Sequence, residues 1–371
     1  MKVVLYIGHH KTGSSALQGY MARNWHALAE AGILYPAVEA EGLSRNLASC
    51  LTGKETTKKL PLVVREPHNA LAFAMISAGT GTPMPHFQRG LPPAREMLRS
   101  LRHQIDLLQP KAVILCSEVM SNFAKQAPGK IEELATLFSG AEVEIYCTLR
   151  RPDLYLASWY GQRLKFGQKI APLRDGGALA YRDTIHFDFA AMIYPWQTAF
   201  PRARFHLRNY ADVLAAGGAV EDFTAQVGVD FPAGLVMPPR ANPGLPYAAM
   251  EIMRRGNQVL NRADRLALRS FLLHRTNVAR LPRNDEVELF GAETRRELYQ
   301  SFLPVHDALN RMTGRDAFFP DLQDMLIAHP IPETELPLPT LRKVRRNIRA
   351  LLLPRAVRGF LRDLRKDLSR R

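Results

Sequence analysis

An octet of glycine, lysine and hydroxyl residues near the N-terminus has the composition of an anion-binding loop. The octet runs from Gly8 to Ser15, reads GHHKTGSS and follows the apolar run VVLYI. A Walker-type nucleotide loop reads G-x-x-x-x-G-K-[ST]. Here both glycines are present, but Ser14 stands at the lysine position and the lysine is Lys11. The loop could bind a phosphate-bearing ligand through Lys11 and its hydroxyls, and the alternative is an ordinary loop in which Ser14 caps the next helix.

A second set of polar residues follows two later apolar runs. Arg150 and Arg151 end the run EVEIYCTL, Pro152 suits the first turn of a helix, and Ser158 comes about two turns later. Arg150 and Ser158 could therefore hold another anionic group; a surface arginine and serine without a ligand are the alternative. The other run ends in Glu118. Neither run ends in the Asp that a Walker-type enzyme uses to hold Mg²⁺.

Alternating strands and helices must position these residues. Continuous apolar strands that alternate with helices indicate a central, mainly parallel sheet between two helical layers, an α/β/α arrangement. In such sheets ligands bind at the carboxyl ends of the strands. We predict strands over 2–8, 112–118, 142–150 and 203–210, helices over 14–32, 92–108, 130–138 and 152–166, and a helical part after about 245. Residues 36–90 show little periodicity and predict an irregular excursion that could shape a substrate pocket.

Two segments resemble the donor site of sulfotransferases. HKTGSSALQ at 10–18 resembles the 5′-phosphosulfate loop of that family, K-T-G-[ST]-[ST]-x-L, at every position. LRRPDLYLAS at 149–158 resembles its 3′-phosphate site, and together the two segments place the resemblance over roughly residues 1–210. The resemblance implies a P-loop-like fold and 3′-phosphoadenosine 5′-phosphosulfate (PAPS) as donor. The glycine-rich RKG segment of the cytosolic members is not found. The implied donor-binding residues are Lys11, Thr12, Gly13, Ser14, Ser15, Arg150 and Ser158.

Sulfuryl transfer would require a charge stabiliser and a base. The transferred group is neutral and SO₃-like, so negative charge develops on the leaving phosphate oxygen, where Lys11 and the loop amides could meet it. No metal is expected. Sulfotransferases use His or Glu as the general base, and Glu118 is the first candidate because it ends a predicted central strand. A capping or solvent-facing carboxylate is the alternative. His10 is the second candidate, with a loop histidine that orients a backbone carbonyl as the alternative.

Composition narrows the class of protein. The chain has 371 residues, 46% of them hydrophobic and 8% aromatic, which is enough for a sizeable core. No apolar stretch reaches the roughly 18 residues of a membrane span, and the first apolar run is too short for a signal peptide. We therefore expect a cytoplasmic protein with reduced structural cysteines at Cys50, Cys116 and Cys147.

Most of the positive charge lies in the last part of the chain. Residues 341–371 contain 12 Lys/Arg against Asp363 and Asp367, a net +10 out of +15 for the whole chain. We predict two basic amphipathic helices here. The apolar stripe of the first includes Leu341, Val344, Ile348 and Leu351, and that of the second includes Val357, Phe360, Leu361, Leu364 and Leu368. Such helices suit peripheral contact with an anionic membrane at its inner face; alternatively the stripes pack back on the protein. Nucleic acid is not expected, because no reader motif accompanies the charge.

The expected function is metal-independent sulfuryl transfer from PAPS to a hydroxyl or amine of a carbohydrate, glycolipid or lipid-linked acceptor. The sulfotransferase domain is predicted over 1–330, and a linker with the basic tail over 331–371. One alternative is a P-loop kinase of small molecules, which the missing Walker lysine and strand-end Asp oppose. The other is a non-catalytic nucleotide-binding protein, associated with membrane or nucleic acid, that keeps only a vestigial loop.

Overall fold

The computed structural model describes residues 1–52, 60–88, 90–238, 244–274, 278, 281–346 and 348–370. The chain folds into two compact units. The first contains Met1–Arg151, Asp188–Ala241 and Ala308–Phe318, and the second contains Pro152–Phe187, Asn242–Asp307 and Phe319–Arg371. The predicted division at residue 330 stays a prediction.

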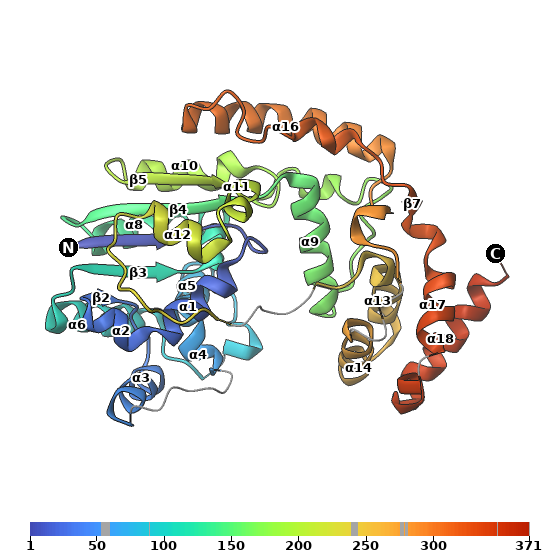
Figure 1. Ribbon diagram of the computed structural model, residues 1–371, viewed down its shortest axis with the longest axis horizontal. Helices are drawn as coiled ribbons and strands as arrows, with labels where there is room; N and C mark the ends of the chain where they lie inside the picture. The colour runs from blue at the N-terminus through green and yellow to red at the C-terminus, as the bar shows by residue number, and fades with distance from the viewer. Residues whose placement is uncertain are drawn as a thin grey trace. The chain divides into compact units, whose positions relative to one another are not determined.

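A five-stranded parallel sheet forms the centre of the first unit (Figure 1). Its order is β2-β3-β1-β4-β5. Tyr6, the last residue of β1, is in register with Cys116 of β3 on one side and Tyr146 of β4 on the other. The carboxyl ends of these three strands therefore lie side by side, and the predicted α/β class with a parallel sheet is confirmed. The strands are β1 (Lys2–Tyr6), β2 (Ile33–Leu34), β3 (Ala112–Cys116), β4 (Glu142–Leu149) and β5 (Arg204–Asn209).

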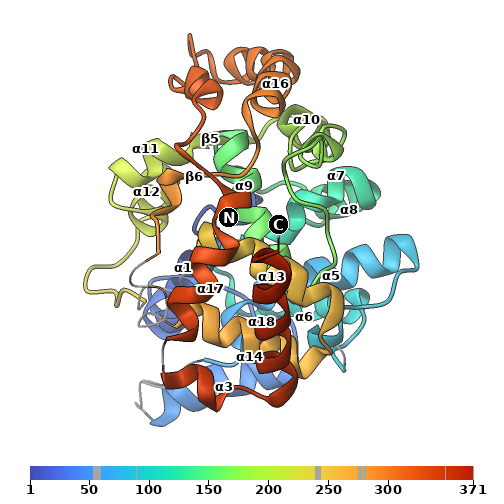
Figure 2. The same cartoon turned by 90° about the vertical axis from the view of Figure 1, so that its right-hand side faces the viewer.

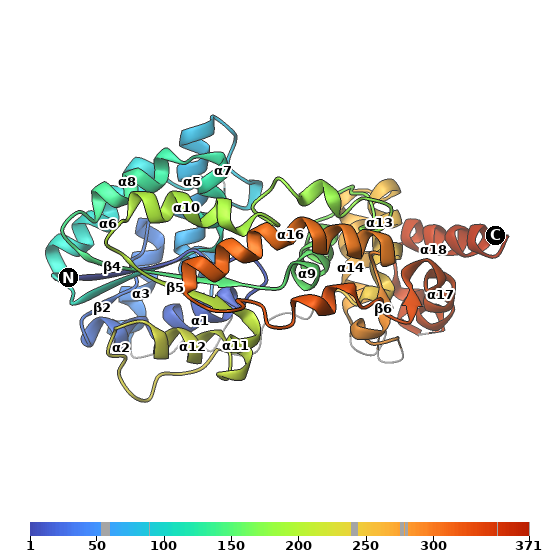
Figure 3. The same ribbon diagram turned by 90° about the horizontal axis from the view of Figure 1, so that it is seen from above.

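Helices cover both faces of this sheet (Figure 3). Val4 and Tyr6 pack with Leu17 of α1 and Phe223 of α12 on one face. Val3 and Leu5 are equally buried, and since side chains alternate along a strand they point to the other face, where α5, α8 and α10 lie. The helices of the first unit are α1 (Ser14–Arg23), α2 (Trp25–Glu30), α3 (Ala40–Thr52), α4 (Leu62–Arg65), α5 (Pro67–Thr80), η1 (His86–Gln88), α6 (Ala94–Leu108), η2 (Glu118–Asn122), α7 (Phe123–Gln126), α8 (Gly129–Leu137), α10 (Phe189–Ala199), α11 (Tyr210–Ala215) and α12 (Ala219–Gln226).

Two expectations for this unit need correction. The helix predicted over 14–32 is interrupted at Asn24, whose side-chain amide donates to the Tyr20 and Val236 carbonyls instead of continuing one helix. Residues 36–90, expected to be irregular, are largely helical in their described part and include α3, α4 and α5. Most side chains of α5 are buried, so the helix lacks the polar face that periodicity would reveal. The role of this segment in a substrate pocket stays a prediction.

The second unit is helical around α13, which packs on α9, α14 and α17 (Figure 2). Its C-terminal part is not all helical, because two short parallel strands pair Val287 with Ile331. The elements are α9 (Pro152–Lys165), η3 (Leu179–Tyr181), α13 (Tyr247–Val259), α14 (Arg262–Leu273), η4 (Asn284–Glu286), β6 (Val287–Glu288), α16 (Ala292–Thr313), η5 (Leu322–Leu326), β7 (Ile331–Pro332), η6 (Glu333–Glu335), α17 (Pro337–Arg345), η7 (Ile348–Leu352) and α18 (Arg355–Leu368). The last residues of α16, from Ala308 on, belong to the first unit.

The C-terminal tail belongs to this second unit. Leu341, Val344, Val357, Leu361 and Leu364 are buried, so most of the two apolar stripes packs back on the protein. Leu351, expected in the first stripe, is 68% exposed because α17 ends before it. The side chain of Ile348 lies outside the described part. Among the described residues, no helix combines the length and apolar character needed to cross a membrane.

Candidate functional site

Two glycines shape the loop between β1 and α1. Lys11 and Gly13 both adopt positive φ, 66° and 100°. A Cβ on Gly13 would lie 2.5 Å from the Cβ of Ala219, at the start of α12. A Cβ on Gly8 would lie 2.9 Å from the Thr148 nitrogen on β4. The two glycines thus let the loop pass close to its neighbouring elements, because a Cβ at either position would clash with them.

The loop leaves a row of backbone donors unused. Within the described chain, no backbone carbonyl accepts from the N–H groups of Lys11, Thr12, Gly13, Ser14 or Ser15. Gly13 is the residue before the first turn of α1, and no side chain caps this helix end. The expected alternative of Ser14 as an N-cap is therefore wrong. Unused donors at a helix start, with the positive end of its dipole, suit an anion.

Two cations accompany these donors. Lys11 and Arg150 are both half-buried, and the parts of the chain that the structure describes offer no carboxylate partner to either. Burial, together with the positive charge of Arg150, lowers the pKa of the Lys11 ammonium. The Nε atom of Arg150 is buried and has no hydrogen-bond partner among the described residues. An anionic ligand would relieve both the mutual repulsion and the unsatisfied donor.

Arg150 is oriented by a residue that sequence reasoning missed. Its guanidinium carbon lies 5.3 Å from the centre of the Tyr210 ring. Leu149 and Asn209 are in register on β4 and β5, so the residues that follow them meet at the same sheet edge. An aromatic residue at the end of the last predicted strand was the available signal. The cation–π contact holds the guanidinium without neutralising it.

Glu118 comes two residues after β3, as the first residue of η2, and is neither a cap nor in solvent. The N-cap of η2 is Ser117, whose side chain accepts from the Val119 N–H. Only 14% of the Glu118 side chain is exposed. Its carboxylate accepts from Gln18 Nε2 at 3.0 Å and from Asn69 Nδ2 at 3.3 Å.

Ser14 connects Glu118 to the loop. Its hydroxyl also hydrogen bonds to the Glu118 carboxylate. Ser14 and Gln18 are four residues apart and so lie on one face of α1. Burial raises the pKa of Glu118 above its ordinary value, although the hydrogen bonds from Ser14, Gln18 and Asn69 oppose the rise. A carboxylate with a raised pKa, held by neutral donors, is suited to accept a proton.

His10 lies beside Glu118, so the two candidate bases belong to one site. His10 Nδ1 is 3.8 Å from Glu118 Oε1. Burial, with a contribution from the Lys11 charge, lowers the pKa of His10 to about 4. The imidazole is therefore neutral at pH 7 and does not form an ion pair with the carboxylate. Burial thus acts on the two pKa values in opposite directions, raising that of Glu118 and lowering that of His10.

The remaining predicted donor-binding residues differ in which polar groups they leave available for a ligand. The Thr12 hydroxyl is fully buried, donates to the His9 carbonyl at 2.6 Å and contacts the Tyr6 hydroxyl at 3.1 Å, so it braces the loop. Only the Thr12 N–H is left for a ligand. Ser15 is exposed at the start of α1. Ser158 lies on α9 in the second unit, and its pairing with Arg150 stays a prediction.

Two supporting residues were also missed. Gln18 could have been found from its spacing to Ser14, because i and i+4 share a helix face. Asn69 had no such signal, since it lies on α5 within the segment that looked irregular. Its carbonyl oxygen accepts from Ser117 Oγ at 2.7 Å and from Gln18 Nε2 at 3.2 Å, so Asn69 connects β3 to α1.

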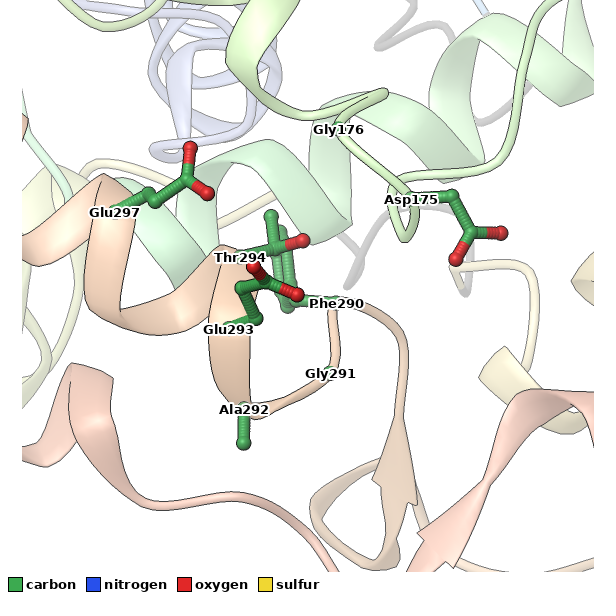
Figure 4. Close-up of a pocket in the computed structure, with 8 residues that line it drawn as sticks. All are labelled: Asp175, Gly176, Phe290, Gly291, Ala292, Glu293, Thr294 and Glu297. Carbon is green, nitrogen blue, oxygen red and sulfur yellow. The ribbon is translucent and has the colours of Figure 1, made fainter.

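The second unit contains a separate acidic hollow of about 380 Å³ at the start of α16 (Figure 4). The carboxylates of Asp175, Glu293 and Glu297 line it. Like charges repel, so this hollow does not suit a donor that carries several phosphates. The described residues contain no group of three or more His, Cys, Asp or Glu placed to hold a metal ion.

Comparison with known proteins adds one partial similarity. No model of a known protein family matches the chain, and no solved structure matches it. A curated protein of Archaeoglobus fulgidus, described as "Uncharacterized protein", is 31% identical over 135 residues. The alignment covers 35% of this chain and 35% of that protein. The chain is thus similar to about a third of this relative, whose description states no activity.

Proposed function

We propose that this protein is a sulfotransferase with a P-loop-like fold that transfers the sulfuryl group of PAPS to a hydroxyl or amine. One observation carries the proposal: the N–H groups from Lys11 to Ser15 have no backbone acceptor within the described chain, and two unneutralised cations, Lys11 and Arg150, accompany them. Such a set of donors favours a ligand with several anionic oxygens. The resemblance of residues 10–18 and 149–158 to the sulfotransferase donor site selects PAPS among such ligands.

The residues fit a donor with two anionic ends. Lys11 and the loop N–H groups would hold the phosphosulfate. Arg150, whose buried Nε has no hydrogen-bond partner among the described residues, would hold the 3′-phosphate. When bound, PAPS supplies a sulfuryl group that is attached to a good leaving group. Lys11 and the loop amides then place positive charge where the leaving phosphate oxygen becomes negative.

Glu118 would serve as the general base. As the acceptor oxygen bonds to sulfur and the sulfur–oxygen bond to the phosphate breaks, the hydroxyl proton moves to the Glu118 carboxylate. Ser14 and Gln18 hold that carboxylate beside the loop. His10, neutral and 3.8 Å away, would orient the carboxylate or the acceptor. We propose a carbohydrate, glycolipid or lipid-linked acceptor and a cytoplasmic location.

The donor can be tested before any acceptor is known. We expect adenosine 3′,5′-bisphosphate, without metal, to raise the melting temperature by several degrees at about 100 times its Kd, where binding adds about 2.7 kcal/mol. Arg150→Gln and Lys11→Ala should lose most of this shift because each removes a charge that meets a phosphate. Arg95→Gln is the matched control and should keep the shift, because Arg95 is an exposed arginine of α6 that pairs with no carboxylate of the described residues.

Two outcomes would contradict the proposed sulfotransferase activity. Stabilisation by ATP with Mg²⁺ but not by the bisphosphate would favour a kinase. A bisphosphate shift without sulfuryl transfer from PAPS to any hydroxyl or amine acceptor in a broad panel would favour a non-catalytic nucleotide-binding protein.

A further inference from the structure

Four arginines of the C-terminal helices line one hollow. Arg342, Arg345 and Arg346 come from α17 and the residue after it, and Arg365 comes from α18; together they line about 370 Å³. The two helices pack on each other within the second unit (Figure 2). Their guanidinium groups are therefore held together by the fold and not only by sequence proximity.

The charge of these arginines is not neutralised by the protein. All four side chains are exposed. Within the described chain, none of them forms an ion pair or a side-chain hydrogen bond. Four like charges around one hollow repel each other unless anions enter, and guanidinium groups bind phosphate oxygens in a bidentate manner.

The segment between the two helices adds an apolar feature to the charge. η7 packs on α17, and its Leu351 and Leu352 are 68% and 84% exposed. Most of the apolar stripes of α17 and α18 is buried, so these side chains are not available to insert into a bilayer. A membrane contact made by this part of the chain would therefore use the exposed leucines and the exposed arginines.

We propose that this surface, formed by Arg342, Arg345, Arg346, Arg365, Leu351 and Leu352, docks the protein on an anionic phospholipid bilayer. The arginines bind lipid phosphates, and the two leucines enter the interface beside them. Charge complementarity and exposed leucines on the same segment favour a bilayer over a soluble polyanion, which would use the charge but not the leucines. The inference does not depend on the proposed enzymatic function.

The test is cosedimentation of the full chain with vesicles of phosphatidylcholine alone or mixed with phosphatidylglycerol. We expect binding only to the mixed vesicles, weakened by salt. Each basic residue near an anionic surface contributes roughly fivefold to binding, so changing the four arginines to Gln should weaken binding by roughly 600-fold. Leu351→Ser with Leu352→Ser should weaken it at least about tenfold.

A matched variant separates the surface from net charge. Arg95, Arg99, Arg202 and Arg204 are exposed arginines of the first unit, and none of them forms an ion pair with a described residue. Their combined change to Gln removes the same charge and should leave vesicle binding within about twofold. Equal losses in both fourfold variants would overturn the proposal. So would vesicle binding that ignores the leucine changes, or binding to duplex DNA that is as tight as to vesicles and lost with the same arginines.

Discussion

The pair formed by Glu118 and His10 shows how environment separates two candidate bases. Both are largely buried and lie 3.8 Å apart, but burial acts on them in opposite directions. It raises the pKa of the carboxyl and lowers that of the imidazole to about 4, because in each case the charged form loses solvation. The carboxylate is thus the better proton acceptor at neutral pH, and the histidine is a neutral neighbour.

Glu118→Gln should lower kcat by roughly 10² to 10⁴, the usual contribution of a general base. The wild-type rate should fall as pH drops through the raised Glu118 pKa, above 4.5, since protonation removes the acceptor. The variant should lose this acid limb, as measured in pH–rate profiles with donor saturating. His10→Gln is the control and should keep the limb with a smaller loss of rate. A Glu118→Gln enzyme with full activity and an intact acid limb would show that the base lies elsewhere.

At the scale of elements, the anion loop exists because three elements meet at one glycine. β1 delivers the chain to the sheet edge, α1 begins immediately after Gly13, and α12 begins at Ala219 against the same residue. Gly13 satisfies two demands at once, a positive φ and contact without a Cβ. A larger residue would have to move α12 or distort the loop.

Gly13→Ala should therefore lower both stability and donor binding. Positive φ alone costs an alanine about 1 kcal/mol, and the 2.5 Å approach to Ala219 adds to it. Gly140→Ala is the control: Gly140 has φ 85° and no atom within 4 Å of an added Cβ, so it carries the φ cost only. Urea unfolding and bisphosphate binding of both variants measure the difference. Equal destabilisation, with bisphosphate binding intact in both, would contradict the role assigned to Gly13.

On the scale of the whole chain, the basic tail is part of the second unit's core and not an appendage. Removing residues 354–371 takes away Val357, Leu361 and Leu364, which are 0%, 2% and 7% exposed. Burying one such side chain is worth about 1.5–3 kcal/mol, so the truncated chain should lose at least about 4 kcal/mol and melt at lower temperature. The variant with Gln at Arg342, Arg345, Arg346 and Arg365 should melt as wild type, because it changes only exposed side chains. An unchanged melting temperature after truncation would show that the tail does not support the fold.

Much of the architecture could be read from residue patterns alone. The apolar runs predicted the four longer strands to within two residues, and the alternation predicted a parallel sheet, because a strand buried on both faces needs a continuous apolar run. The octet after the first strand and the arginine after β4 were placed at strand ends for the same reason. In α5 most side chains are buried, so its apolar residues do not recur with the helical period, and the sequence analysis did not predict this helix.

The sequence by itself determined the types of side chain at the strand ends, since local periodicity and turn residues specify where each strand stops. Only the tertiary structure decided which of them meet. The strand order puts β3 and β4 on either side of β1, and so joins Glu118 to Ser14 and Arg150 to the charge of Lys11. Asn69, Tyr210 and Ala219 belong to the site because segments far apart in the chain pack together. The periodicity of a single sequence does not reveal such contacts.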